Sequence, residues 1–289
     1  MTRLIDVEFF KLRKRMMTWI LALVLVVLLY LILWNVSGEA TSRLSLNRRF
    51  TPADLRRVLF VQFSVPFSLQ LVGNFGLVLA VIFAAGAAGG EYAWGTVRLM
   101  ATTASGRMRL VAAKLIVVSA LVAIGALLAV AVGLFCSWLI TTTSGGSDYS
   151  FVNGPFLRDQ LAAYGRTLFV LSPYVSMAFC LALVGRSTLA GVGGGLGVSL
   201  IGPLIASLMD QAGDPWKSLP QYFIHTNAQI ILAQNAVPQP LPRFGPSLRE
   251  LVREGARPPD EAAIILLVYV VIFLAIAFVV FRRRDITAA

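Results

Sequence analysis

Long apolar stretches without a charged side chain alternate with short basic segments along this chain of 289 residues. Six of these stretches are close to, or longer than, the roughly 20 residues that a helix needs to cross the hydrocarbon core of a bilayer. Because lipid offers the backbone no hydrogen-bonding partner, a helix is the economical conformation for each stretch. The pattern therefore predicts an all-α integral membrane protein. We expect six spans, at about residues 17–36, 67–88, 111–140, 163–184, 188–209 and 262–281.

A basic segment, Met1–Arg15, precedes the first span. Apolar residues recur on one helical face and basic residues lie towards the other: Ile5, Phe9, Leu12 and Met16 against Arg3, Lys11, Lys14 and Arg15. This predicts an amphipathic helix on the membrane surface; the alternative is an unstructured basic flank that sets the topology. The first span is too long for the apolar core of a secretory signal, and no small-residue cleavage site follows it, so we expect an uncleaved span.

An even number of spans puts both termini on the same side of the membrane. The positive-inside rule makes this side cytoplasmic, because the basic residues of the short connections gather there: Lys11–Arg15, Arg98, Arg107, Arg109, Lys114, Arg186 and Arg282–Arg284. Three segments then face outward. We expect a short helix from Thr51 in Ser37–Pro66, a loop in Thr141–Gln160, and one helix, Ser247–Glu254, in Asp210–Glu261.

Composition excludes several classes of function. Hydrophobic residues make up 57% of the chain and charged residues 13%, against about 25% charged residues in soluble domains. The net charge of +11 lies beside the spans, so anionic lipid headgroups are expected partners and nucleic acid is not. The single histidine, His225, has no metal-ligand spacing around it, and Cys136 and Cys180 lie in apolar runs. We therefore expect no catalytic residue, cofactor site, metal site or disulfide.

The charge-free stretches also indicate where energy for transport would come from. Ion-coupled pumps usually carry carboxylates, histidines or cations at membrane depth, whereas these stretches offer only amides, hydroxyls and backbone. The chain contains no G-x-x-x-x-G-K-[ST] phosphate loop. We therefore expect the chain itself not to be an enzyme. If it drives uphill transport, a separate polypeptide must bind ATP and Mg.

One connection between spans stands out: GGEYAWGTVRLMATTASGRMRLVAAK, residues Gly89–Lys114. Its two leading glycines, Gly89 and Gly90, are expected to let the backbone turn as the second span ends. Glu91 would stand near the start of a short helix, where the helix dipole favours a carboxylate. This predicts a cytosolic helix that a soluble motor could grip. The alternative is an interfacial turn in which Tyr92 and Trp94 only mark headgroup depth.

The order of these parts resembles the membrane subunits of type-2 ABC transporters, mostly bacterial exporters. The resemblance lies in EFFKLRKR before the first span, GGEYAWGTVRLM and SGRMRLVAAK around the connection, the turn Gly185-Arg186-Ser187, and the closing FRRRDI. It implies that residues 1–15 are an elbow helix and that Gly90–Ser105 is a coupling helix docked on a separate ATP-binding subunit. The residues expected at this interface are Glu91, Tyr92, Trp94, Gly95, Thr96, Arg98 and Arg107.

The resemblance also implies a complex of two membrane subunits, here expected to be a homodimer, with two ATP-binding subunits. One segment departs from the pattern. In some relatives a re-entrant helical feature precedes the last span, whereas this chain carries the proline-rich run Val237–Pro246.

Polar and small residues of spans two and five are candidates for a translocation path. Gln70 and Asn74 share one face of the second span, and polar side chains at depth should face protein or a cavity. The fifth span carries small-x-x-x-small spacings, which equally suit close helix packing. The resemblance implies that both spans line the central route. The glycines concerned are Gly191, Gly193, Gly194, Gly195 and Gly197.

Together these features predict the permease subunit of an ATP-driven exporter in the bacterial cytoplasmic membrane, made of one permease domain over residues 1–289. The charge-free spans favour an amphipathic or hydrophobic cargo. The alternatives are a motor-independent channel or facilitator, an intramembrane enzyme, and an immunity-type or scaffold protein that acts by binding. A channel is disfavoured because the spans carry no charged ring or filter sequence.

Overall fold

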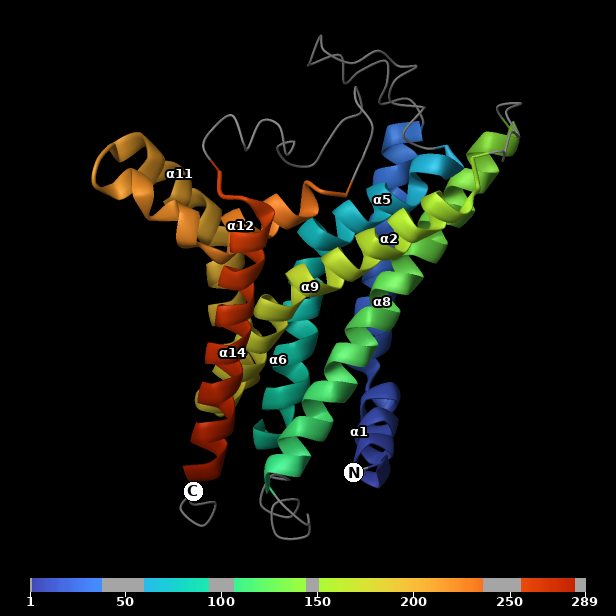
Figure 1. Ribbon diagram of the computed structural model, residues 1–289. Helices are drawn as coiled ribbons and strands as arrows, with labels where there is room; N and C mark the ends of the chain where they lie inside the picture. The colour runs from blue at the N-terminus through green and yellow to red at the C-terminus, as the bar shows by residue number, and fades with distance from the viewer. Residues whose placement is uncertain (1, 38–59, 94–106, 144–150, 236–255, 284–289) are drawn as a thin grey trace.

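The computed structural model describes residues 2–37, 60–93, 107–143, 151–235 and 256–283, and every regular element in these ranges is helical. Figure 1 shows long helices side by side, with the two chain ends at the same end of the bundle. The elements are α1 (Thr2–Lys14), α2 (Met16–Ser37), α5 (Val61–Leu71), η1 (Val72–Gly76), α6 (Leu77–Ala93), α8 (Arg107–Thr143), α9 (Gly154–Val184), α10 (Thr188–Leu196), η2 (Gly197–Ile201), α11 (Gly202–Ala212), η3 (Trp216–Ser218), η4 (Pro220–Tyr222), α12 (Ile224–Leu232) and α14 (Pro259–Arg283).

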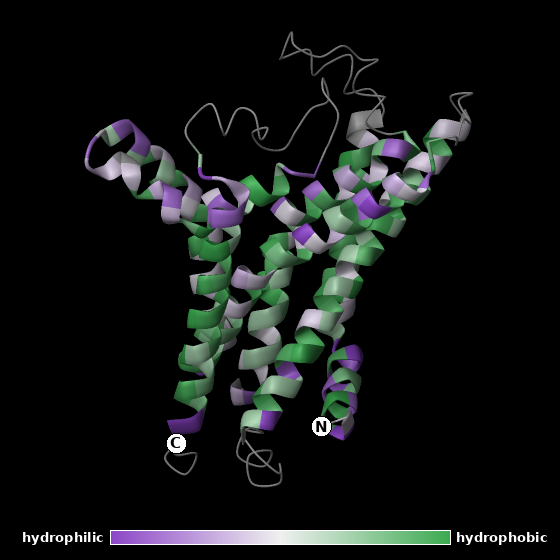
Figure 2. Ribbon diagram, in the orientation of Figure 1, coloured by the Kyte–Doolittle hydropathy of each residue, from purple (hydrophilic) through white to green (hydrophobic). Residues whose placement is uncertain are grey.

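Six segments of the described chain are long and apolar enough to cross a membrane, which confirms the predicted number of spans. Hydrophobic residues follow the middle of the long helices, while hydrophilic residues gather at the two ends of the bundle and on α1 (Figure 2). The segments are Met16–Trp34, Val61–Tyr92, Met108–Thr142, Gly154–Val184, Thr188–Ala212 and Pro259–Arg283.

Spans two and four form the centre of the bundle. In each of them, 72% of the most apolar stretch is buried, against 17–22% in the other four spans. Alanines make this packing close, because Ala84, Ala85, Ala87 and Ala88 on α6 are all buried and small side chains let helix backbones approach each other within a membrane. The four outer spans expose apolar side chains, as expected of helices that face lipid.

Two expected boundaries are wrong. The segment Thr141–Gln160 was expected to be a loop, but α8 continues to Thr143 and α9 begins at Gly154. The side chain of Asn153 accepts a hydrogen bond from the backbone N–H of Phe156 at 2.9 Å, and Pro155 lies in the first turn. This N-cap with an early proline starts the helix before the apolar stretch begins. The segment Ser37–Pro66 likewise ends in helix, since α5 begins at Val61.

The expected turn at Gly89 and Gly90 is also wrong. Both residues lie inside α6, which continues to Ala93, so Glu91 belongs to the last turn of this helix and not to the start of a new one. Glycine is tolerated inside membrane helices because the hydrophobic surroundings favour internal hydrogen bonds. The two glycines therefore serve close packing, not a turn.

The third outer segment contains a helix that the sequence pattern did not reveal. Helix α12, Ile224–Leu232, is mostly buried and packs on α9 and α14. A helical feature therefore does precede the last span, despite the proline-rich run that follows it. The helices expected from Thr51 and at Ser247–Glu254 lie outside the described residues, as do most of the expected coupling helix and its residues Trp94, Gly95, Thr96 and Arg98.

Helix α1 agrees in extent with the expected N-terminal helix, but its contacts differ. It lies below α2 and packs on the first turns of α8 (Figure 1). Leu12 and Glu8 are buried there, although Glu8 was not expected to face the protein. Its position on a membrane surface stays a prediction.

Candidate functional site

Four charged side chains meet where α1, α6 and α8 come together. Glu8 and Lys11 come from α1, Glu91 from the last turn of α6, and Lys114 from the second turn of α8. The Nζ atoms of Lys114 and Lys11 lie 2.6 Å and 2.7 Å from the same carboxylate oxygen of Glu91. Glu8 also pairs with both lysines, at 3.4 Å from Lys114. We refer to these four residues as the charged cluster.

The charged cluster is buried and electrically balanced. The side chains of Glu8, Glu91 and Lys114 are only 2–6% exposed, and two carboxylates alternate with two ammonium groups. Removing such charges from water costs several kcal/mol for each ion unless partners compensate. Lys114 also donates a hydrogen bond to the carbonyl of Ala87 at 3.4 Å. The cluster therefore fastens three helices at one end of the bundle.

This arrangement changes the interpretation of Glu91. Its carboxylate is engaged within the chain, so contact with an ATP-binding subunit remains a prediction that the geometry does not support directly. Tyr92, the next residue, packs on the hydrophobic core, and Arg107 begins α8. In the sequence, Glu91 precedes residues 94–106 and Lys114 follows them, so the charged cluster joins the two helices that enter and leave this segment.

Glu91 was predicted as a site residue from the sequence, but its partners were not. Lys11 was placed on the polar face of an interfacial helix, Lys114 was counted as part of a basic flank, and Glu8 was not considered. A local signal exists, because Glu8 and Lys11 are three residues apart and face the same side of a helix. The decisive contacts join residues far apart in the sequence, such as Lys11 and Glu91, which are 80 positions apart, and periodicity does not reveal them.

A second close contact at the end of α6 joins this helix to the start of α10. At Gly89, an added Cβ would lie 2.6 Å from the Cα of Thr188, the first residue of α10, and 2.8 Å from the carbonyl carbon of Ser187 in the turn between α9 and α10. Arg186 in this turn has a positive φ of 52°, and Ser187 caps α10 by accepting a hydrogen bond from the backbone N–H of Leu189 at 3.1 Å. Gly89 is thus required because backbone packs directly on backbone.

Spans two and five each contain one turn of π-helix, η1 and η2. In such a turn, some carbonyls lose their regular helical partner. Asn74 donates its side-chain N–H to the carbonyl of Gln70 at 2.8 Å in span two, and Ser199 donates its hydroxyl to the carbonyl of Gly195 at 2.7 Å in span five. π-turns of this kind are frequent at functional sites. Ser199 was not among the predicted path residues.

Asn74 also connects span two to α12. Its side-chain oxygen accepts a hydrogen bond from Gln229 at 3.2 Å. One residue earlier, an added Cβ at Gly73 would meet Leu232 of α12 at 2.7 Å. The side-chain oxygen of Gln70 is buried and has no hydrogen-bonding partner in the part of the chain that the structure describes. The predicted pair Gln70 and Asn74 therefore faces protein, and Asn74 fixes the position of α12.

Arg166 of α9 holds the other end of α12. Its guanidinium donates to the carbonyl of Gln234 at 3.3 Å and to the side chain of Asn235 at 3.2 Å. Asn235 in turn donates to Thr167 at 3.3 Å. A cation is favoured at the C-terminal end of a helix, where carbonyls lack partners.

We expect Arg166→Met to destabilise the protein by about 1.5 kcal/mol, because a charged donor to two oxygens is lost while its site is half-buried. Thermal unfolding in detergent micelles measures this change. Arg158→Met, which removes an exposed cation from the same helix, should leave the unfolding temperature nearly unchanged. Equal effects of the two substitutions would contradict the anchoring role of Arg166.

The glycines of span five divide into two groups. At Gly191, Gly194 and Gly195, an added Cβ would lie within 3 Å of side chains on α6 or α9, so these residues serve close helix packing. At Gly193 and Gly197, an added Cβ would meet nothing within 4 Å. The packing explanation therefore holds for the first group.

A cavity of about 540 Å³ lies between α9, η2, α12 and α14. Its lining includes Gly194, Gly197, Met177, His225 and Phe273, but neither Gln70 nor Asn74. The two groups of predicted path residues thus do not share this cavity. Burial lowers the pKa of His225, which favours the neutral imidazole in this cavity wall.

Six apolar helices long enough to cross a membrane define a multi-pass membrane protein. In it, α1 is fastened to the end of span two and the start of span three. A family model described as ABC-2 family transporter protein matches residues 4–202. The match covers more than half of the chain, so the chain belongs to this family and is a membrane component of a transporter. A comparison with curated proteins gives no match.

The matched residues include the charged cluster and both π-turns, whereas α12 and α14 follow the match. The family is one of permeases and not of ATPases. Membership implies association with an ABC ATP-binding subunit.

Proposed function

We propose that this chain is the permease subunit of an ATP-driven exporter in the bacterial cytoplasmic membrane. Two copies would form a homodimer and work with two copies of a separate subunit that binds ATP and Mg. The observation that carries the proposal is the charged cluster, which joins α1 to α6 and α8, the two helices connected in sequence by residues 94–106. A force applied to this segment would move all three helices together.

The orientation follows from the distribution of cations. The end of the bundle that holds both chain termini also holds the start of α8 and the end of α14 (Figure 1). Basic residues gather there on short segments: Lys11, Arg13, Lys14, Arg15, Arg107, Arg109, Arg282 and Arg283. The positive-inside rule favours the cytoplasm for this end, where ATP is available to the partner.

The mechanism we propose begins when ATP binding draws the two ATP-binding subunits together. Residues 90–105 of each permease, docked on these subunits, would pull on the ends of α6 and α8. The charged cluster transmits this motion to α1, and the close contact at Gly89 transmits it to the turn between α9 and α10. Rigid-body movement of packed helices would then open the path outward, and hydrolysis would restore the starting state.

The test is co-purification from membranes of the native host. We expect the tagged chain to retain an ATPase, and Gly95→Trp to weaken this association by about 1–3 kcal/mol, because a bulky ring would disturb a close-fitting interface. Gly154→Trp is the matched control, since Gly154 is exposed and an added Cβ there meets nothing within 4 Å. Co-purified ATPase activity per amount of chain is the measurement.

If the Gly95→Trp protein retained full co-purified ATPase activity, residues 90–105 would not form the interface. Absence of any ATPase from the purified wild-type chain would favour the motor-independent alternatives, a channel or a binding protein. Transport into sealed vesicles that requires ATP would separate export from mere binding.

A further inference from the structure

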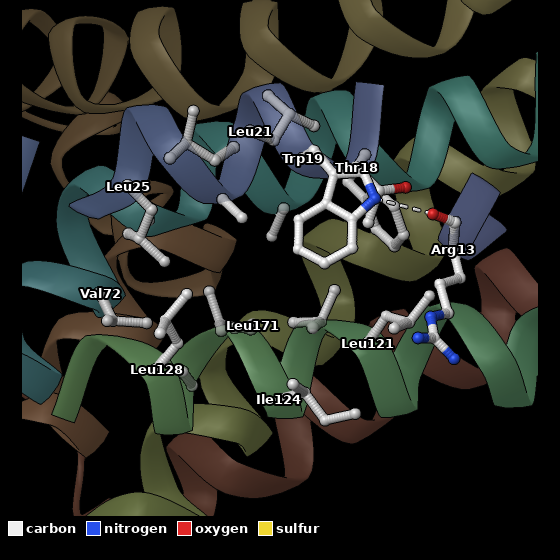
Figure 3. Close-up of a pocket in the computed structure, with 18 of the residues that line it drawn as sticks. Arg13, Thr18, Trp19, Leu21, Leu25, Val72, Leu121, Ile124, Leu128 and Leu171 are labelled. Carbon is white, nitrogen blue, oxygen red and sulfur yellow. Dashed lines mark hydrogen bonds between the residues drawn. The ribbon is translucent and has the colours of Figure 1, made fainter. Parts of the chain in front are cut away.

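A cavity of about 320 Å³ lies between α1 and α2 on one side and η1, α6 and α8 on the other. Its wall is almost entirely apolar, and Figure 3 shows Leu25, Val72, Leu121, Leu128 and Leu171 around it. The volume is within the range of ligand-binding pockets, which begins near 300 Å³. An apolar cavity of this kind does not hold water well, because water finds no polar partners in it. Hydrocarbon is the chemistry that fits.

The polar side chains of this cavity, Arg13, Thr18 and Trp19, lie together near the junction of α1 and α2 (Figure 3), and the Thr18 hydroxyl donates to the carbonyl of Leu12 at 2.6 Å. Trp19 is 63% exposed, and its indole N–H donates to the backbone carbonyl of Arg13 at 2.8 Å. The guanidinium of Arg13 lies beside Leu121 at the edge of the cavity (Figure 3). Trp is the residue that typically marks the level of lipid headgroups.

Arg13 differs from the two cations that follow it. Lys14 lies over the ring of Phe10, 5.6 Å from its centroid, and Arg15 donates to the carbonyl of Gly86 at 3.2 Å. Among the described residues, the guanidinium of Arg13 has no hydrogen-bond or ion-pair partner. A cation without a protein partner at the mouth of an apolar cavity is suited to an anionic group attached to a hydrocarbon chain.

The depths of Arg13 and of the apolar space correspond to those of the headgroup and the acyl chain of a lipid. Arg13 precedes Met16, the first residue of span one, by three positions. From Leu121 to Leu128 the cavity wall follows α8 for seven residues, or about 10 Å at 1.5 Å for each residue. The cation therefore lies at headgroup level, and the apolar space extends from there into the hydrocarbon region.

Glycine leaves this space open. At Gly125 of α8, which lines the cavity, an added Cβ would meet nothing within 4 Å. Side chains of α2, α6 and α8 therefore do not fill the gap between these helices. Close packing normally fills such gaps, so an occupant would complete the packing of span one against spans two and three.

We propose that this cavity binds an acidic phospholipid, with an acyl chain between α2, α6 and α8 and the phosphate paired with Arg13. The bound lipid would belong to the leaflet on the side of the charged cluster. This inference goes beyond export, and it does not require the ATP-binding subunit.

The experiment uses Trp19 as a reporter. The purified full-length chain is titrated in neutral detergent micelles with phosphatidylglycerol or phosphatidylcholine carrying brominated acyl chains, which quench tryptophan fluorescence on contact. Subtracting the signal of the Trp19→Phe protein isolates Trp19 from the other four tryptophans. We expect half-maximal quenching of Trp19 at about fivefold less phosphatidylglycerol than phosphatidylcholine, the preference that one basic residue near the surface gives.

Two variants test the two halves of the site. Arg13→Gln should abolish the preference for phosphatidylglycerol, whereas Arg3→Gln, an exposed cation on the same helix, should retain it. Gly125→Phe should reduce quenching by both lipids because the ring fills the cavity. Gly165→Phe is its control, since Gly165 of α9 is exposed and has equally open surroundings.

Three results would overturn the proposal. Wild-type protein that is quenched equally by both lipids, or by neither, would show that the cavity selects no acidic headgroup. A preference that survives Arg13→Gln would place the headgroup elsewhere. Unchanged quenching in the Gly125→Phe protein would place the acyl chain outside the cavity. None of these readings depends on ATPase binding, so failure here and failure of the exporter proposal are distinguishable.

Discussion

Replacing Lys114 by methionine is expected to destabilise the protein by about 3–5 kcal/mol, the usual cost of removing one member of a buried ion pair. Methionine resembles the lysine stem in length, so packing changes little. The loss is electrostatic: Glu8 and Glu91 would then share Lys11 alone, and a buried negative charge would remain without compensation. Thermal unfolding in detergent micelles, monitored by circular dichroism, measures the change.

Arg109→Met is the matched control for this substitution. Arg109 lies on the same helix, α8, but is exposed, and surface charges contribute about 0–1 kcal/mol. We therefore expect its unfolding temperature to stay close to that of the wild type. A large effect of Arg109→Met would indicate that the net charge of this helix matters and that the specific pairs do not.

A second substitution separates the charged cluster from general disruption. Glu91→Gln alone leaves a surplus positive charge and should also destabilise the protein. The double variant Lys114→Met/Glu91→Gln retains the Glu8–Lys11 pair and is electrically balanced again. Its loss of unfolding free energy should therefore be smaller than the sum of the two single losses by about 2 kcal/mol or more, as expected of residues in direct contact. Additive effects would contradict the cluster.

The double variant also tests function. It is electrically balanced, but it loses all the ion pairs that join α1, α6 and α8 and keeps only the Glu8–Lys11 pair within α1. If these pairs transmit motion from residues 94–106, ATP-dependent export should fall several-fold for each amount of folded, membrane-inserted protein. Full export by a stable double variant would assign the cluster a purely structural role.

The number of spans was predictable because it depends on composition alone. A helix in lipid needs about 20 apolar residues, and the chain presents six such stretches. The positions of helix ends were less predictable. Gly89 and Gly90 were expected to let the chain turn as span two ends, but in a membrane environment the backbone keeps its hydrogen bonds. Here Gly89 permits contact with Thr188, and Gly90 lies against the side chain of Arg15. The contact that explains them is not local in sequence.

Helix α12 was missed for a related reason. It mixes polar and apolar residues, and prolines flank it. Its buried Asn227 donates to the carbonyls of Gln221 and Phe223, at 2.9 Å and 2.8 Å, and Gln229 donates to Asn74. These partners make it possible to bury polar side chains, but they are provided by the tertiary structure. The charged cluster was missed likewise, since opposite charges far apart in sequence give no periodic signal.

Gly89→Ala is expected to destabilise the protein, although most glycine-to-alanine changes inside a helix stabilise it by about 0.5–1 kcal/mol. An added Cβ would overlap the backbone of Ser187 and Thr188, which cannot move aside as a flexible side chain can. We expect a loss of about 3 kcal/mol, at the upper end of the range for overpacking, because α6 must separate from the turn between α9 and α10.

Gly193→Ala gives the opposite expectation and serves as the control. Gly193 is also inside a membrane helix, but an added Cβ there meets nothing within 4 Å, so only the gain in helix propensity remains. Unfolding temperatures of the two variants in the same detergent should therefore shift in opposite directions. A stabilising or neutral effect of Gly89→Ala would show that α6 does not pack on this turn. The proposed transmission of motion from span two to span five would then lose its physical contact.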